Sequence, residues 1–174
     1  MVDVFSEDES EPSAYPAKPS GLSTAATVID KAVIWQRIEA YISHRWATRN
    51  VQWVLGGPGV WVPRLKPTTL DSAEFWNGDN WETLTLEAAP LGYDLGEAMY
   101  RVNATVGSTD DPPAAVLEAY RRLSEYLAET EGGRVASSVT HSFGDVTFEQ
   151  TRPATWQAKA LHYSGAADLL RRYR

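Results

Sequence analysis

Apolar residues recur at helical spacing across residues 112–131. The positions are Val116, Tyr120, Leu123 and Leu127. Steps of three and four residues place these side chains on one face, so the segment is predicted to be an amphipathic helix. Asp110-Asp111 is expected to cap it, Pro112 fits the first helical position, and Gly132-Gly133 is expected to end it. The apolar face must be buried, so the rest of the chain is expected to pack there.

A second helical pattern runs from Thr24 to Ala47. Its inward face is predicted to contain Ile34, Ile38, Tyr41, Ile42 and Arg45, with Trp35 and Trp46 beside it. Ser23 or Thr24 can start the helix, and Thr27 with Asp30 resembles a weak capping box. We therefore expect one helix of roughly 35 Å, since each helical residue adds about 1.5 Å.

The period changes to alternation in the middle of the chain, where Val51, Trp53 and Leu55 occupy every second position. Strands are predicted at 51–55, 60–62, 69–76, 81–86 and 100–106. Asn77-Gly78-Asp79-Asn80 is a strong hairpin signal between two of them, and Gly107 is expected to end the last. The pattern predicts an α+β fold: a small helical core with an inserted antiparallel β-sheet of roughly four to six short strands, and extended N- and C-terminal arms.

The two ends differ from this middle region. Residues 1–22 are acidic and rich in serine and proline, which predicts a flexible arm that is solvated or that orders against a neighbouring subunit. Residues 23–133 are predicted to form the central domain. Residues 134–174 are predicted to hold an extended segment with a loose hairpin over 139–149, and then an amphipathic helix weakened at Gly165. That last helix is expected to dock on its own core or on a partner.

Composition and charge narrow the range of possible functions. The chain has 174 residues, a net charge of −7 and no cysteine, so disulfides and thiolate metal sites are excluded. The net negative charge argues against a protein that binds nucleic acid through contacts with its phosphates. It is compatible with a surface past which DNA slides without binding. No apolar run approaches the length of a membrane span, and the acidic start is no secretory signal, so we expect a soluble, unexported protein.

Candidate chemistry is sparse. His44, His141 and His162 have no metal-ligand spacing, and Glu82 and Glu87 are predicted to lie on opposite faces of a strand. The glycine-rich stretch at 56–59 lacks the lysine and the following helix of a phosphate loop. We therefore expect no enzyme activity, no catalytic or metal-binding residues and no cofactor.

The order of elements carries a resemblance. A helix over 28–46 leads through Arg49-Asn50-Val51-Gln52-Trp53 into a tryptophan- and proline-rich hairpin. A strand ending at Gly107 passes through Asp110-Asp111-Pro112-Pro113 into the next helix, and the chain closes with the sequences SFGDVTF and LLRRYR. Over residues 28–174 this order is similar to the head–tail connector proteins, or adaptors, of long-tailed bacteriophages and gene transfer agents. The acidic arm and the many tryptophans depart from it.

The resemblance implies a structural virion protein at the capsid–tail junction, assembled in the host cytoplasm. It implies a ring, expected to hold twelve copies, beneath the portal protein, with a tail-side joining protein (a stopper or tail terminator) on the other side. DNA would pass through the channel without specific binding, and no membrane is involved.

Two sets of residues are predicted to make contacts in such a ring. The set expected to bind the portal is Trp156, Tyr163, Leu169, Leu170, Arg171, Arg172, Tyr173 and Arg174. The set expected between subunits is Phe5, Tyr15, Trp35 and Trp46. Both sets are aromatic-rich, as protein interfaces are.

Three other readings remain open at this point. The first is a stopper or tail-completion ring protein, distinguished by which neighbour it binds. The second is a β-rich carbohydrate-binding module, which requires exposed Trp53, Trp61, Trp76 and Trp81 to stack on sugar rings. The third is a small hydrolase that uses His141.

Overall fold

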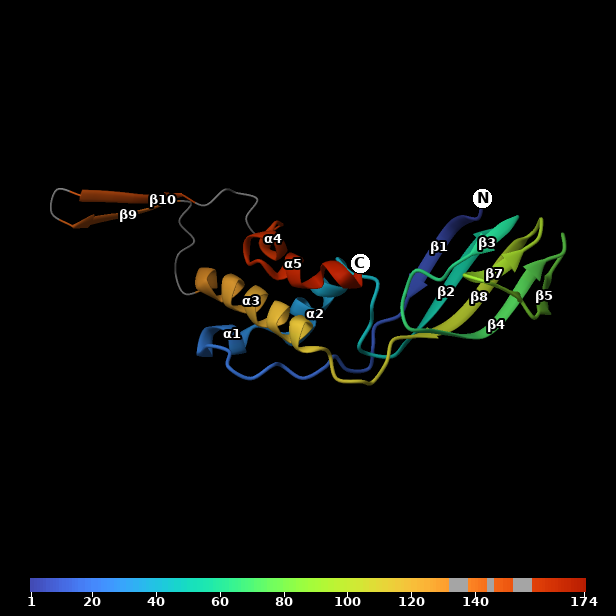
Figure 1. Ribbon diagram of the computed structural model, residues 1–174, viewed down its shortest axis with the longest axis horizontal. Helices are drawn as coiled ribbons and strands as arrows, with labels where there is room; N and C mark the ends of the chain where they lie inside the picture. The colour runs from blue at the N-terminus through green and yellow to red at the C-terminus, as the bar shows by residue number, and fades with distance from the viewer. Residues whose placement is uncertain (132–137, 144–145, 152–157) are drawn as a thin grey trace. The chain divides into compact units, whose positions relative to one another are not determined.

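The computed structural model describes residues 1–131, 138–143, 146–151 and 158–174, and within them the side chains of residues 1–129 and 158–174. The chain divides into two compact units, each made of two separate stretches (Figure 1). The sheet unit comprises residues 1–16 and 43–111, and the helical unit comprises 17–42 and 112–174. The boundaries of these units differ from the predicted domain boundaries, which lay between residues 22 and 23 and between residues 133 and 134. The mixed content of helices and antiparallel strands confirms the α+β class.

Five antiparallel strands form the main sheet, in the order β1-β2-β8-β4-β5. They are β1 Asp3–Glu9, β2 Arg49–Gly56, β4 Thr68–Trp76, β5 Trp81–Leu84 and β8 Met99–Val106. A second sheet has the order β3-β7-β6. Its strands are β3 Gly59–Trp61, β6 Glu87–Ala89 and β7 Gly92–Leu95. The sequence pattern missed β1, β6 and β7, since two of these strands are very short and the third is strongly acidic.

The core of the sheet unit follows the predicted alternation. The buried side chains of β2 and β8 are Val51, Trp53, Leu55, Tyr100, Val102, Ala104 and Val106. Successive side chains of a strand point to opposite faces, so Gln52 and Asn103 lie on the outer face, where their side chains form a 2.8 Å hydrogen bond. Gly107 ends β8 with a φ of 90°, and a Cβ there would lie 2.5 Å from the Ala47 carbonyl oxygen. Only glycine fits this position.

The N-terminal residues do not form a flexible arm. β1 pairs antiparallel with β2, with a bulge between Val4 and Ser6, and so becomes an edge of the main sheet. The prediction from composition was wrong because composition indicates only how little apolar surface the segment can bury. It does not reveal ion pairs or backbone pairing with a distant strand. This strand is held by backbone hydrogen bonds and by ion pairs of Glu7 and Glu9.

The predicted first helix is two helices, α1 Thr24–Val28 and α2 Lys31–Glu39. The Ser23 hydroxyl caps α1 by accepting a 3.2 Å hydrogen bond from the backbone N–H of Ala26. Asp30 caps α2, accepting at 2.9 Å from the backbone N–H of Ala32. Asp30 thus opens a new helix instead of completing a capping box inside a longer one.

The predicted amphipathic helix is α3, Ala114–Glu131. Val116, Tyr120 and Leu123 are buried, as its spacing predicts, and the Trp35 ring of α2 lies 5.3 Å from the Tyr120 ring. The backbone N–H groups of residues 116 and 117 both donate to the carbonyl of Pro113, so the helix begins after the proline pair. The expected position of Pro112 inside the first turn is therefore wrong. The predicted cap at 132–133 lies outside the described residues.

The C-terminal segment folds back onto α3. It contains α4 Ala160–Tyr163, α5 Ala166–Leu170 and the 3₁₀ turn η1 Arg171–Tyr173. Gly165 separates α4 from α5 with a φ of 72°, at the predicted weak point. Ala166, Ala167 and Leu170 are buried, and α5 contacts α3. Of the two placements expected for this segment, docking on its own core is the one observed.

A separate hairpin follows α3. β9 Ser138–Phe143 and β10 Val146–Thr151 pair antiparallel as a two-stranded sheet of their own. This confirms the loose hairpin predicted over 139–149.

Candidate interaction surfaces

The histidines do not form a catalytic cluster in the part of the chain whose side chains are described. The backbone of His44 forms an isolated parallel β-bridge with Lys66, and its ring packs against Trp46 at a tilt of 36°, with 4.4 Å between ring centroids. Burial lowers the pKa of His44, and the positive charges of Arg45 and Lys66 lower it further, so the ring is neutral near pH 7. The His162 ring lies edge-on to Tyr41 at 5.8 Å. The side chain of His141 lies outside the described ones.

The described residues offer neither a metal site nor a membrane-spanning helix. Those residues contain no group of three side chains that could ligate a metal. None of the helices in that part of the chain combines the length and hydropathy that crossing a bilayer requires.

Glu9 anchors β1 through two nearly buried guanidinium groups. Arg45 donates to both carboxylate oxygens of Glu9, at 2.6 and 2.9 Å, and Arg49 donates to one of them at 3.1 Å. Burial raises the pKa of Glu9, but the hydrogen bond from Arg45 and the charges of Arg45 and Arg49 outweigh it and hold the pKa below its usual value. The carboxylate therefore stays ionised and fixes the end of the strand.

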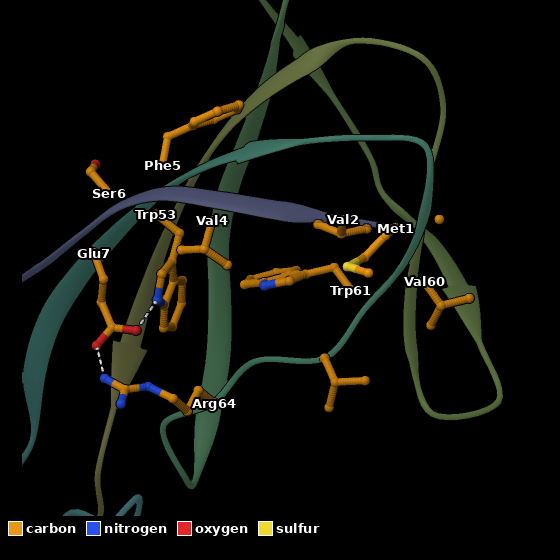
Figure 2. A pocket seen from close by; sticks show the side chains of 12 residues that line it. Met1, Val2, Val4, Phe5, Ser6, Glu7, Trp53, Val60, Trp61 and Arg64 are labelled. Atoms are coloured by element: carbon orange, nitrogen blue, oxygen red, sulfur yellow. Dashed lines mark hydrogen bonds and ion pairs between the residues drawn. The ribbon is translucent and has the colours of Figure 1, made fainter.

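A hollow of about 700 Å³ opens beside β1 (Figure 2). We call it the edge hollow; its main lining residues are Val4, Trp53, Val60, Trp61, Val62 and Arg64. The rings of Trp53 and Trp61 meet edge to face at 5.2 Å and are almost fully buried. Val4, Val60 and Val62 are each at least half exposed around them.

The polar end of the edge hollow is satisfied within the chain. Glu7 accepts a 2.9 Å hydrogen bond from the indole nitrogen of Trp53 and forms an ion pair with Arg64. Figure 2 shows Phe5 on the opposite side of β1 from Glu7. The hollow is therefore an apolar surface bordered by two sheet edges, since β1 and β3 each end their sheet.

The residues predicted between subunits divide into two kinds. Phe5 is 62% exposed and is free for an external contact. Tyr15 is half-buried, and the Arg49 guanidinium lies 5.6 Å from its ring centre. Trp35 and Trp46 are buried within the chain, which corrects their assignment as inter-subunit contacts. The apolar periodicity around these two tryptophans indicated packing in the core of the chain and not contact with another subunit.

The residues predicted to bind a portal also divide. The described exposed members are Tyr163, Arg171, Arg172 and Arg174, while Leu169 and Tyr173 are half-buried. Leu170 is fully buried against its own unit, so it supports this surface from beneath and cannot itself be a contact, which corrects its assignment. Arg174 lies 4.7 Å from the centre of the Tyr41 ring. Trp156 lies outside the described residues.

The four tryptophans proposed as a sugar-binding platform do not share a surface. Trp53 and Trp61 are buried, whereas Trp76 is 38% exposed and Trp81 is half-buried. Trp76 and Trp81 pair across β4 and β5 at 5.4 Å. The platform postulated from the sequence is therefore wrong.

The backbones of β9 and β10 pair in a continuous antiparallel register. Directly opposed pairs are Phe143 with Val146, His141 with Phe148, and Val139 with Gln150.

Sequence reasoning missed the edge hollow and the Glu9 anchor. The available signal for a strand was the alternation of Glu7 and Glu9 after Val4. Acidic residues are poor strand formers, so this alternation did not lead to a strand prediction. The partners Arg45 and Arg49 lie about forty positions away, and only the fold brings them to Glu9.

No family model, no curated protein and no solved structure matches this chain.

Proposed function

We propose that this chain is a structural virion protein, a head–tail adaptor that forms a ring beneath the portal and joins the capsid to the tail. The observation that carries the proposal is the path of the chain through its elements. Helices α1 and α2 lead into an inserted sheet unit, α3 returns to the helical unit, and a hairpin precedes helices that close back on α3. This is the order on which the resemblance to head–tail connectors depends.

The exposed C-terminal surface is the proposed contact with the portal. Arg171 and Arg172 are exposed on η1, and Tyr163 is 49% exposed on α4. Aromatic and arginine side chains are enriched at protein interfaces because both contribute large contact areas and directed polar contacts. Deleting residues 153–174 is a poor test of this contact, since the deletion also removes Leu170 from the core of the helical unit.

The net charge supports the passage of DNA. At −7, the surface repels the phosphate backbone, so DNA would slide through a ring of such subunits without binding specifically. No described feature distinguishes a portal-side adaptor from a stopper or tail-completion ring, so the identity of the bound neighbour separates these two roles.

The decisive experiment measures the mass of the purified full chain, alone and mixed with candidate portal rings, by native mass spectrometry. A monomer that becomes a closed ring on a portal is the expected result, with twelve copies expected. A chain that ignores every portal but assembles on a tail-side ring would instead identify a stopper. A chain whose mass changes with neither would contradict the proposal.

A further inference from the structure

Strand β1 leaves one edge of the main sheet open. Within the described parts of the chain β1 pairs with β2 alone, so the backbone groups that alternate residues direct toward its other edge have no strand partner there. Proteins recognise extended segments by adding them as a strand to an open edge of this kind. The side chains on the two faces of β1 indicate which segment fits.

On the inner face, β1 borders the edge hollow (Figure 2). Val4, Val60 and Val62 are each at least half exposed around it, above the buried rings of Trp53 and Trp61. The ion pair at its polar end is already formed within the chain. An added strand that places apolar side chains on this face would therefore bury valine surface without leaving a charge unpaired.

On the outer face, β1 presents two carboxylates and one aromatic ring. Asp3 and Asp8 are exposed and lie opposite Gly56 and Gln52, which the alternation of β2 places on the outer face. A Cβ at Gly56 would lie 2.7 Å from the Phe5 ring, so this ring covers the same face. Lysine and arginine suit these neighbours, because a cation pairs with carboxylates across strands and packs on an aromatic ring.

The same acids argue against pairing with β1 of a second copy. The strand Asp3–Glu9 contains four acidic side chains and no basic one. Two such strands side by side would bring like charges opposite one another, which destabilises the pair. The occupant is therefore a segment of a different protein.

We propose that the open edge of β1 binds an extended, basic segment of another protein as an added strand. In that segment, apolar residues that cover the edge hollow alternate with lysines or arginines that face Asp3 and Asp8. This inference goes beyond the adaptor function and does not rest on it, because it concerns the sheet unit alone. The contact is smaller than the roughly 1,200 Å² of a stable protein pair, so the segment by itself is expected to bind weakly.

The test follows the fluorescence anisotropy of labelled eight-residue peptides during titration with the full chain. The first peptide alternates valine and lysine, and the second has four valines followed by four lysines. Two further versions of the alternating peptide carry N-methyl groups on every valine or on every lysine. Each of these versions lacks every second backbone N–H, so at least one of them cannot donate to β1.

The alternating peptide is expected to bind at least about tenfold more tightly than the block peptide and than at least one N-methylated version, because strand pairing needs both the alternation and the backbone donors. Equal binding of all four peptides would mean general attraction to an acidic protein and would overturn the inference. Undetectable binding of the alternating peptide at about 1 mM overturns it as well.

A substitution in the edge hollow locates the bound peptide. Val62→Lys is expected to weaken binding of the alternating peptide at least about fivefold, because a cation replaces apolar surface beneath its valines. Val62 is half exposed, so the folded chain tolerates the change. Leu91→Lys, at a position 80% exposed outside the hollow, is the matched control. Equal binding by these two variants places the peptide elsewhere and overturns the inference.

A second pair of variants tests the outer face. Asp3→Asn with Asp8→Asn is expected to weaken binding and to reduce its dependence on salt, because two cation partners are lost. Asp79→Asn with Asp94→Asn, at two exposed positions elsewhere in the sheet unit, makes the same change in net charge. If the two double variants bind the peptide alike, the charge complementarity proposed for β1 is wrong.

Discussion

Glu9 shows how a single carboxylate can determine where the first strand lies. Its partners Arg45 and Arg49 have side chains only 6% and 4% exposed, so both guanidinium groups meet this carboxylate largely out of water in the folded sheet unit. The neighbouring Asp8 is exposed and takes no part in these bonds. The same strand thus carries one structural acid and one solvated acid in adjacent positions.

Replacing Glu9 with glutamine is expected to destabilise the sheet unit by roughly 2–3 kcal/mol, because removing one partner of a nearly buried pair leaves charge poorly compensated. Urea unfolding followed by tryptophan fluorescence measures this, since Trp53 and Trp61 lie in that unit's core. Asp8→Asn is the matched control and is expected to change the free energy of unfolding by less than about 0.5 kcal/mol. Equal effects of the two variants would contradict the anchoring role.

The stabilisation from Glu9 is also expected to depend on pH. The pKa of Glu9 in the folded protein lies below its ordinary value of 4.5, so its contribution is fully present above that pH and is lost as pH falls through the folded pKa. The difference in unfolding free energy between the natural chain and Glu9→Gln should be constant from pH 7 to about pH 5 and shrink below it. A difference that stays constant down to pH 3 would show that the carboxylate charge is not responsible.

At the scale of elements, α5 has both a structural side and an exposed side. Leu170 is fully buried, while the adjoining turn η1 exposes Arg171 and Arg172. Arg171 pairs with Asp168 at 3.0 Å, but both side chains are more than three-quarters exposed, so this pair adds little to stability. The basic side chains of η1 can therefore be changed without disturbing the core beneath them.

Reversing both charges, Arg171→Glu with Arg172→Glu, is expected to weaken portal binding at least about tenfold, because it replaces two interface cations with anions. Far-UV circular dichroism should show an unchanged thermal transition. Lys159→Glu, an exposed charge reversal in the same unit, controls for general charge effects. Undiminished binding of the double variant, measured against immobilised portal rings, would remove η1 from the proposed contact.

At the scale of the whole molecule, the acidic charge is concentrated at the N-terminus. Residues 1–11 contain five acidic side chains and no basic one. Glu7 and Glu9 are used in ion pairs, whereas Asp3, Asp8 and Glu11 are exposed. In a ring, the exposed acidic side chains of all copies would add up to a strongly negative surface.

Changing Asp3, Asp8 and Glu11 to their amides is expected to slow DNA ejection or retain DNA, if these acids face the channel, because the repulsion between wall and phosphate falls. The measurement is the rate of DNA release from particles that carry the variant, at two salt concentrations. The effect should diminish at high salt, since screening weakens repulsion in both proteins. Unchanged release at low salt would exclude these acids from the channel wall.

Elements whose stabilising contacts are local can be predicted directly from the amino-acid pattern. The spacing of Val116, Tyr120 and Leu123 specified α3, the alternation through Trp53 specified β2, and the turn at 77–80 specified the β4–β5 hairpin. Each of these signals depends on neighbours within about ten positions, where periodicity and turn chemistry act.

Elements that depend on pairing between distant segments become visible only in the folded protein. Strand β1 exists because its acids meet Arg45 and Arg49 and its backbone meets β2, and neither partner is visible from an acidic stretch of sequence. The division into two units, the burial of Trp35 and Trp46, and the return of α5 onto α3 likewise depend on contacts between segments far apart in the chain. Burial is set by such contacts and not by residue type, so an aromatic side chain in the core and one at an interface have the same local pattern.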